Sequence, residues 1–189
     1  MADEWGPLGA LIGDWENEHR ALDGLDVSYS HEREQVWNSS YRERASLKPF
    51  GPVVNGSQSL YGLDYRSAMW REDDGIPFHA EVGYWLWDSA TGEILRACVL
   101  RRGISVLAGG FTTADASSFT MSAGADGSHY RVGENFYLAD HASTVSYEIA
   151  VTLHADDSWT YAQTSLLHMD QFEGLFPHTN SNHMVRSEG

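Results

Sequence analysis

The feature that most constrains this chain is a succession of strand-length segments whose side chains alternate in character. The cleanest spans residues 145–154, where Val, Tyr, Ile, Val and Leu alternate with Ser, Glu, Ala, Thr and His. Successive side chains of a strand point to opposite faces, so this segment has one apolar face. About ten such segments, roughly 8–15 residues apart and joined by hairpin-length turns, predict an antiparallel sandwich or an up-and-down barrel. The meander of short turns favours an all-β barrel of about ten strands, because closing the sheet removes its exposed edges.

One helical segment precedes the strands. Leu8, Leu11 and Ile12 recur at helical spacing after Pro7, which suits the first turn of a helix. We therefore expect a short helix over residues 7–12 that caps one end of the barrel. A surface helix packed on a sandwich is the alternative. The length of 189 residues predicts a single domain over residues 1–189.

Three further segments give less regular patterns. We interpret residues 27–38 as one long polar strand, residues 50–52 as a turn, and residues 130–138 as a strand with an irregular middle. The pair Gly109-Gly110 lies inside the strand expected over residues 104–113. Glycines inside a strand usually mark a bulge or a bend, and such bends curl a sheet into a barrel.

Charge and cysteine content exclude several classes of protein. The formal net charge is −15, which argues against nucleic-acid partners and against binding to anionic membranes. Cys98 is the single cysteine, so neither an intramolecular disulfide nor a cysteine-rich zinc site can form. The first residues are acidic where a signal peptide would be basic, and no run approaches the ~18 apolar residues of a membrane span. We expect a cytoplasmic protein with no membrane partner.

Residues 76–87 form a strand whose two faces differ most. Pro77 suits the first position of a strand. After it, one face is apolar, whereas the other carries His79 and Glu81 and then Trp85 and Trp87. A polar pair followed by large aromatic side chains suits the wall of a ligand cavity. The alternative is a solvated His and Glu, with the tryptophans covering a second core.

The histidines are the candidate ligands of a metal. His79 and Glu81 share one strand face, so a divalent metal held by nitrogen and oxygen is one option there. His178 and His183 are five residues apart and fall on opposite faces of a regular strand. They would not bind one ion together. His178 follows Pro177 and could reach into a cavity as a single axial ligand, or serve as a turn histidine that binds a carbonyl.

Three motifs stand at the start, middle and end of the chain: Leu-Ile-Gly-Asp-Trp at 11–15, Pro-Phe-His-Ala-Glu-Val-Gly-Tyr at 77–84, and Pro-His at 177–178. In this order they resemble the nitrobindin family, which are haem-binding β-barrels similar in shape to fatty-acid-binding proteins. Residues 83–87, 107–110 and 178–182 are similar to a bacterial branch of nitrobindin-like proteins. The resemblance extends over nearly the whole chain.

The resemblance implies a ten-stranded antiparallel barrel that binds haem b at one open end. It implies that His178 is the axial ligand of the iron and that His79 lies beside the haem without bonding to the metal. The implied functions are reversible binding of nitric oxide and isomerisation of peroxynitrite to nitrate, as in a peroxynitrite isomerase; no catalytic residue is implied. A homodimer is a possible assembly.

The chain departs from the family in its opening motif, Gly-x-Trp-x-Gly-x-Gly. Gly13 and Trp15 match, but Asn17 and His19 replace the later glycines, and we expect this to alter packing at the start of the barrel. Two alternatives to haem binding remain. One is a haem-free barrel that binds a lipid-like or aromatic small molecule. The other is a structural barrel without a ligand, filled by its own aromatic side chains.

Overall fold

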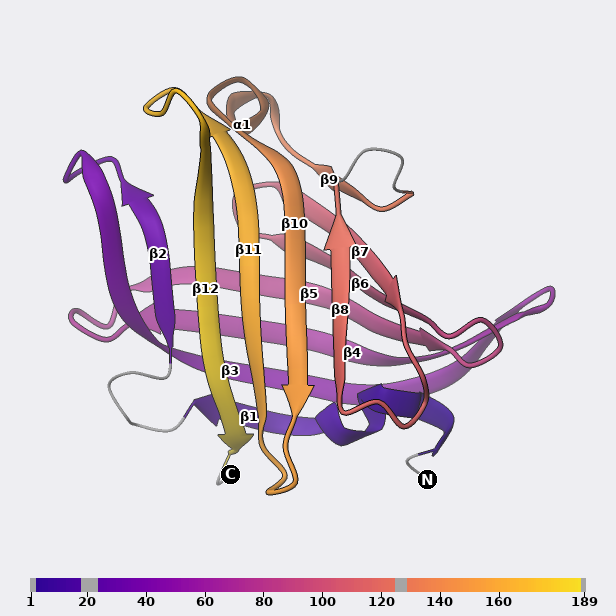
Figure 1. Cartoon of the computed structure of the whole chain (residues 1–189). Helices are drawn as coiled ribbons and strands as arrows, with labels where there is room; N and C mark the ends of the chain where they lie inside the picture. The colour runs from indigo at the N-terminus through magenta and orange to yellow at the C-terminus, as the bar shows by residue number, and fades with distance from the viewer. Residues whose placement is uncertain (1–2, 18–23, 125–128, 188–189) are drawn as a thin grey trace.

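A computed structural model describes residues 3–17, 24–124 and 129–187, which form a closed antiparallel β-barrel (Figure 1). The strands follow one another around the wall in nearly the order of the sequence, as the meander of short turns predicted. The elements are η1 Asp3–Leu11, β1 Gly13–Asn17, β2 Leu25–Ser30, β3 Gln35–Asn55, β4 Gln58–Arg71, β5 Pro77–Asp88, β6 Glu93–Leu100, β7 Ile104–Phe111, β8 Ser118–Ala123, β9 Arg131–Gly133, α1 Phe136–His141, β10 Ala142–Leu153, β11 Trp159–Met169 and β12 Leu175–Arg186.

The sheet of the described residues has twelve strands but ten positions around the wall. β1 and β2 share one position, because both pair with β3 on one side and with β12 on the other. β8 and the short β9 likewise both pair with β7, at different points along it. The predicted ten-stranded up-and-down barrel is therefore confirmed, with two of its positions divided between two strands.

Asn17 joins the two strands that share a position. The ladder between β1 and β3 ends at Glu16, and the ladder between β2 and β3 begins at Leu25. At this gap the side chain of Asn17 donates to the carbonyl of Tyr41 and accepts from the amide of Glu43, both at 2.8 Å. The altered packing expected at the start of the barrel is thus a side-chain bridge in place of ladder bonds. His19 lies outside the described residues.

Three expected strand boundaries were wrong. Residues 27–38 are not one strand, because a turn over residues 31–34 separates β2 from β3 and places Glu34 at a φ of 51°. Residues 50–52 do not end a strand; β3 continues through a bulge opposite β4. Residues 130–138 contain β9 and then the start of α1, whose N-cap is Asn135. Its side-chain oxygen accepts from the amide of Leu138 at 3.1 Å.

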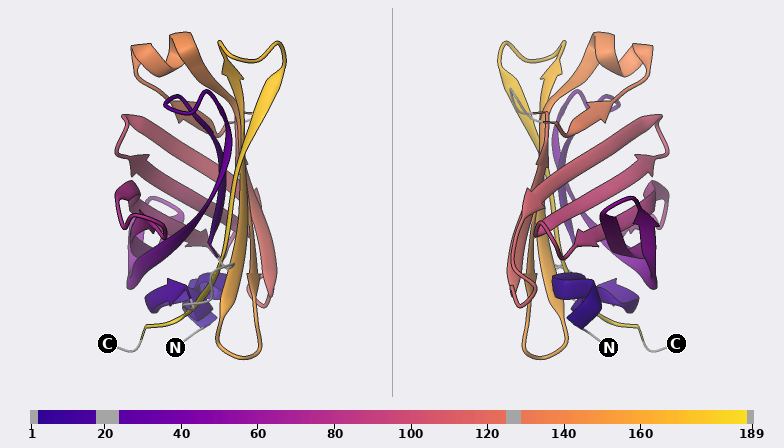
Figure 2. Two further views of the ribbon diagram at one scale, coloured as in Figure 1. Left: turned by 90° about the vertical axis from the view of Figure 1, so that its left-hand side faces the viewer. Right: turned by 90° about the vertical axis from the view of Figure 1, so that its right-hand side faces the viewer.

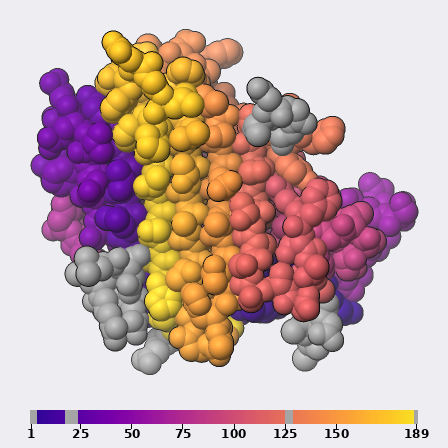
Figure 3. Space-filling view, viewed as in Figure 1, coloured from indigo at the N-terminus to yellow at the C-terminus, as the bar shows by residue number. Residues whose placement is uncertain are grey.

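The wall consists of two faces that cross steeply. β8, β10, β11 and β12 run along one face, and β4 to β7 run across the other, as the views from the side show (Figures 1 and 2). The outer surface of β10 to β12 is continuous and without a deep opening (Figure 3). Gly109 and Gly110 lie where β7 meets β8: a Cβ on Gly109 would come within 2.3 Å of the Tyr130 ring, and one on Gly110 within 2.2 Å of the Thr120 carbonyl.

One end of the barrel is closed by η1 and filled by aromatic side chains. The expected helical cap is present as a 3-10 helix whose Leu8 and Leu11 are fully buried. Above it, Trp15 and Trp159 meet edge to face with centroids 6.0 Å apart, and Trp85 meets Trp159 at 6.4 Å. No helix in the described part of the chain is long and apolar enough to span a membrane. The remaining volume of the barrel lies at the opposite end, beside α1.

Candidate functional site

A cavity of about 420 Å³ occupies the end of the barrel beside α1. This volume lies within the usual range of small-molecule sites. His79 and His178 both line it, together with apolar side chains that include Leu100, Ile104, Val106, Val132, Leu138 and Phe176. A larger hollow of about 1160 Å³ lies on the outer face of the barrel, where Val82 and Tyr84 are exposed, but no histidine lines it.

His79 reaches the cavity from β5, on the strand face that the alternating pattern predicted. A bulge between β4 and β5 falls beside it: Met69 pairs with His79, whereas Trp70 pairs with Pro77. The intervening Phe78 therefore also lines the cavity. Glu81 is only 4% exposed and Val82 on the other face is 52% exposed, so the polar face points inward. The alternative of a solvated His and Glu was wrong.

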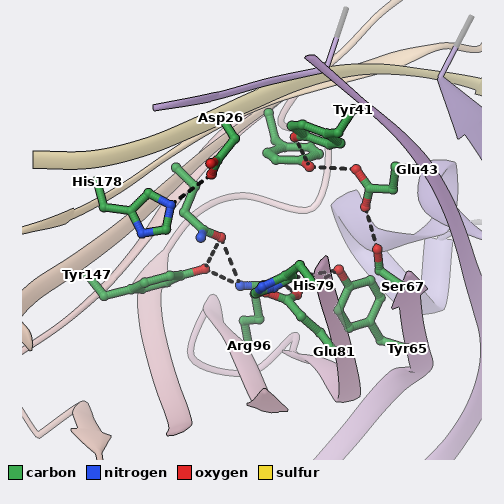
Figure 4. Close-up of polar contacts among 12 residues, drawn as sticks. Asp26, Tyr41, Glu43, Tyr65, Ser67, His79, Glu81, Arg96, Tyr147 and His178 are labelled. Carbon is green, nitrogen blue, oxygen red and sulfur yellow. Dashed lines mark hydrogen bonds and ion pairs between the residues drawn. The ribbon is translucent and has the colours of Figure 1, made fainter. Parts of the chain in front are cut away.

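A buried ion pair between Glu81 and Arg96, here called the floor, lies behind His79 and Tyr147, which line the cavity. The carboxylate of Glu81 accepts from His79 Nε2 at 3.0 Å, and its other oxygen accepts from Tyr65 at 2.9 Å and from the guanidinium of Arg96. Arg96 also donates to the hydroxyl of Tyr147, which itself donates to Gln163 at 2.8 Å. Figure 4 shows this chain of contacts between His79 and Tyr147. The floor thus separates the cavity from the aromatic core with hydrogen-bonded polar groups.

The charges within the floor set the protonation states of Glu81 and His79. Burial raises the pKa of Glu81, but the positive charge of Arg96 and the hydrogen bond from His79 outweigh it and lower the pKa to about 2. Burial lowers the pKa of His79, but the hydrogen bond to Glu81 and its charge outweigh that effect, and the pKa is raised. Glu81 is therefore a carboxylate at neutral pH, and His79 holds its proton to higher pH than a solvated histidine.

His178 enters the cavity from β12, opposite β2. Its Nε2 donates to Oδ1 of Asp26 at 2.8 Å, and Ser28 donates to the other oxygen of Asp26 at 2.8 Å. The side chain of His178 is 36% exposed, whereas that of Asp26 is 7% exposed. In the described part of the chain, the second ring nitrogen of His178 has no hydrogen-bond partner. The interpretation as a turn histidine that binds a carbonyl was wrong, because the partner is a carboxylate.

A second buried carboxylate lies between the cavity and the closed end. Glu43 accepts from Ser67 and Tyr161, both at 2.6 Å, and from Asn182 at 2.9 Å. Burial raises the pKa of this carboxyl group, and hydrogen bonds offset only part of the rise. Figure 4 shows the Glu43 cluster beside Asp26, separate from the Glu81 floor.

Other candidates do not converge on a metal. His183 lies on the opposite face of β12 from His178, as predicted, and its Nε2 contacts the hydroxyl of Ser158 at 2.9 Å. Among the described residues, no three His, Cys, Asp or Glu side chains form a group that could hold a metal ion, and the divalent-metal hypothesis at His79 and Glu81 has no further ligand. Cys98 is buried, and burial raises the pKa of its thiol to about 11, which disfavours the reactive thiolate.

Asp26, Arg96 and Glu43 were missed by the sequence reasoning. All three are charged side chains in alternating strands, where most charged residues are exposed. A signal existed for two of them. Arg96 shares a strand face with Ile94 and Cys98 in a mostly apolar segment, and Glu43 shares one with Tyr41 and Leu47, opposite the face of the neighbouring basic residues. Asp26 becomes identifiable only when the barrel closes.

The cavity suits haem by the chemistry of its donors. A metal-binding histidine usually presents one ring nitrogen to the metal while a carboxylate or carbonyl holds the other. His178 has this arrangement: Asp26 holds one nitrogen and the other is free. The apolar walls would bury a porphyrin face, and several arginines line the cavity. The residues present therefore fit a haem group, and the cavity between His79 and His178 argues against a barrel filled throughout by its own side chains.

Fold and site together define a class: a closed antiparallel barrel with a cavity of small-molecule size at one end and two histidines, His79 and His178, in the cavity wall. The family described as "THAP4-like, heme-binding beta-barrel domain" matches residues 4–186. The chain belongs to this family, which is the nitrobindin family that the motifs indicated. Membership in a haem-binding family supports haem as the cofactor.

A solved structure has the same fold. The crystal structure of Rv2717c from M. tuberculosis superposes with a TM-score of 0.65 at 16% sequence identity, over 96% of this chain and 98% of that one. At this identity the similarity shows the fold alone. A search of curated proteins found no match.

Proposed function

We propose that this protein binds haem b in the cavity beside α1, with His178 as the axial ligand of the iron. The observation that carries the proposal is the His178 imidazole on the cavity wall, with one nitrogen bound to a buried carboxylate and the other without a partner among the described residues. Membership in a family of haem-binding barrels supports it.

The other cavity residues would bind and enclose the group. Phe78, Leu100 and Phe176 supply apolar surface that excludes water from a porphyrin. His79 holds a proton beside the cavity because Glu81 raises its pKa, so it can donate a hydrogen bond to an anionic ligand. When bound, haem supplies an iron with one open coordination position. That chemistry is the one required for nitric oxide binding and for the isomerisation of peroxynitrite, which we propose as the activities of the loaded protein.

The test is a haemin titration followed by absorbance, on the wild type and on His178→Ala. We expect saturable one-to-one binding with a Soret shift that His178→Ala abolishes. His183→Ala is the matched control, because His183 lies on the same strand but on the other face. The proposal fails if the wild type shows no saturable shift, or if His178→Ala binds haemin with the same spectrum. Stopped-flow assays of peroxynitrite decay on wild type and His79→Gln then test the activity.

One observation favours a second candidate. The cavity walls include Leu100, Ile104 and Phe176, and this apolar surface suits a lipid-like or aromatic molecule without any need for iron. This alternative predicts that His178→Ala leaves ligand affinity unchanged, opposite to the haem proposal.

A further inference from the structure

Three arginines line the cavity, although the protein as a whole is strongly acidic. The formal net charge of the chain is −15, with only twelve lysines and arginines, yet Arg71, Arg101 and Arg102 all line this one cavity. They come from the end of β4 and from the turn between β6 and β7. We refer to these three residues as the arginine rim.

The acidic side chains that line the cavity already have partners. Asp26 accepts from His178, Glu134 accepts from both the amide and the hydroxyl of Thr144, and Asp170 accepts from His141 at 2.7 Å. None of the three pairs with the arginine rim. The arginine rim therefore forms no ion pair with the described carboxylates that line the cavity, and its guanidinium groups remain available to a carboxylate of the ligand.

Arg71 is the rim residue with the most specific signal. Its Nε is buried without a hydrogen-bond partner, and no acidic side chain in the described ranges forms an ion pair with it. Its guanidinium carbon stands 5.7 Å from the centroid of the Phe78 ring, beside His79. A buried donor without a partner is costly, and a guanidinium matches a carboxylate by forming two parallel hydrogen bonds.

We propose that the arginine rim, and Arg71 above all, binds the carboxylate end of the ligand whose apolar body fills the cavity. For haem, and thus resting on the function proposed above, these carboxylates are the two propionates. The same chemistry would bind the carboxylate of a long-chain fatty acid. A cavity with apolar walls and the arginine rim should bind an amphipathic acid more tightly than a neutral molecule of the same shape.

The experiment compares acids with their methyl esters, because esterification removes the charge and leaves the body unchanged. The first probe is iron-free protoporphyrin IX against its dimethyl ester, measured by quenching of tryptophan fluorescence. Because this porphyrin has no iron, its binding needs no ligand from His178. The His178→Ala variant should therefore still bind the acid more tightly than the ester, even if the haem proposal fails. The second probe is oleate against methyl oleate, measured by displacement of a fluorescent fatty acid.

We expect the wild type to bind the free porphyrin acid about tenfold or more tightly than its ester, and Arg71→Gln to lose that preference while it binds the ester as before. Arg42→Gln is the control, because Arg42 on the neighbouring strand pairs with Glu72, at 3.3 Å, and does not line the cavity. Arg71→Lys, which keeps the charge but not the two parallel donors, should retain only part of the preference.

Each result decides the proposal. A preference for oleate alone, lost in Arg71→Gln, keeps the carboxylate site and assigns it to a fatty acid. Equal binding of acids and esters by the wild type, or an unchanged preference in Arg71→Gln with its thermal unfolding intact, overturns it.

Discussion

Nε2 of His178 lies 2.8 Å from Oδ1 of Asp26, and this pair joins the last strand of the barrel to one of its first. Iron in haem proteins is bound by a histidine nitrogen whose ring is oriented by a second contact. Asp26 is thus a positioning residue for His178, and its charge makes the imidazole a stronger donor.

The first prediction concerns this carboxylate. Asp26→Asn should weaken haemin binding by about 10- to 100-fold, because the loss of a charged partner to a metal-binding histidine usually has that effect. It should also raise the reduction potential of the bound iron, which spectroelectrochemistry would measure. Asp170→Asn is the control, since Asp170 lines the same cavity but contacts His141. Equal affinity and potential in wild type and Asp26→Asn would show that Asp26 has no influence on the ligand.

The second prediction concerns the pair Glu81–Arg96. Removing one partner leaves the other charge buried, so Glu81→Gln and Arg96→Met should each destabilise the fold by about 3–5 kcal/mol. The double variant should cost less than the sum, because neither charge is then left alone. Urea unfolding of the four proteins measures the coupling. The exposed pair Arg186–Asp157 is the comparison and should couple by at most about 1 kcal/mol. Additive losses at Glu81 and Arg96 would contradict the prediction.

The third prediction follows from the opposite pKa shifts of the two buried glutamates. Burial favours protonation of both, but Arg96 and His79 lower the pKa of Glu81 from 4.5 to about 2. The stability that Glu81 contributes is therefore present above pH 4.5 and lost as the pH falls towards 2. Burial leaves the pKa of Glu43 raised, so its contribution is present below pH 4.5 and lost as the pH rises through the folded pKa.

The measurement is urea unfolding of wild type, Glu81→Gln and Glu43→Gln between pH 3 and pH 8. The difference between wild type and Glu81→Gln should shrink as the pH falls, whereas wild type should lose stability relative to Glu43→Gln as the pH rises. Two parallel curves would show that neither carboxyl group has a shifted pKa in the folded protein.

Local pattern was sufficient to sort the residues of β5 onto two faces but not to say which face points inward. The alternation in residues 76–87 predicted that His79, Glu81 and the tryptophans share one face, because that information lies within one strand, and it left a cavity wall and a solvated face as alternatives. His178 and His183 were separated correctly for the same reason. The contact between His178 and Asp26 joins residues 152 positions apart, and it exists only because β2 and β12 meet when the barrel closes. Periodicity in either strand alone carries no information about that pairing.

The wrong boundaries have a similar cause. Residues 31–34 turn without a glycine or a proline, so the usual turn signal is absent and Glu34 itself adopts a positive φ. The division of one barrel position between β1 and β2 was also beyond sequence patterning, because it depends on where each strand meets β3 and β12.

The fourth prediction tests the bridge at that division. Asn17→Ala should destabilise the fold by about 1–3 kcal/mol, because it leaves the carbonyl of Tyr41 and the amide of Glu43 without their side-chain partner. Asn17→Gly, which also removes the amide side chain, should do the same. Asn55→Ala at the exposed β3–β4 turn is the control. If both Asn17 variants unfold at the same urea concentration as the wild type, water must replace the hydrogen bonds of the Asn17 side chain without loss of stability.

The last prediction concerns Gly83 in the middle of β5. A Cβ on this residue would lie 2.0 Å from the carbonyl oxygen of Ala97 and 2.6 Å from the Cα of Cys98, and both atoms belong to the backbone of β6. Backbone atoms cannot move aside as a flexible side chain can, so Gly83→Ala should destabilise the fold by about 1–3 kcal/mol or more. It should also disturb the nearby floor, because Gly83 lies between Glu81 and Trp85. Gly174→Ala, where a Cβ would meet nothing within 4 Å, is the control and should change stability by less than about 0.5 kcal/mol. Equal unfolding midpoints for the two variants would show that β5 and β6 can separate without loss, and that the close approach of these strands does not stabilise the cavity floor.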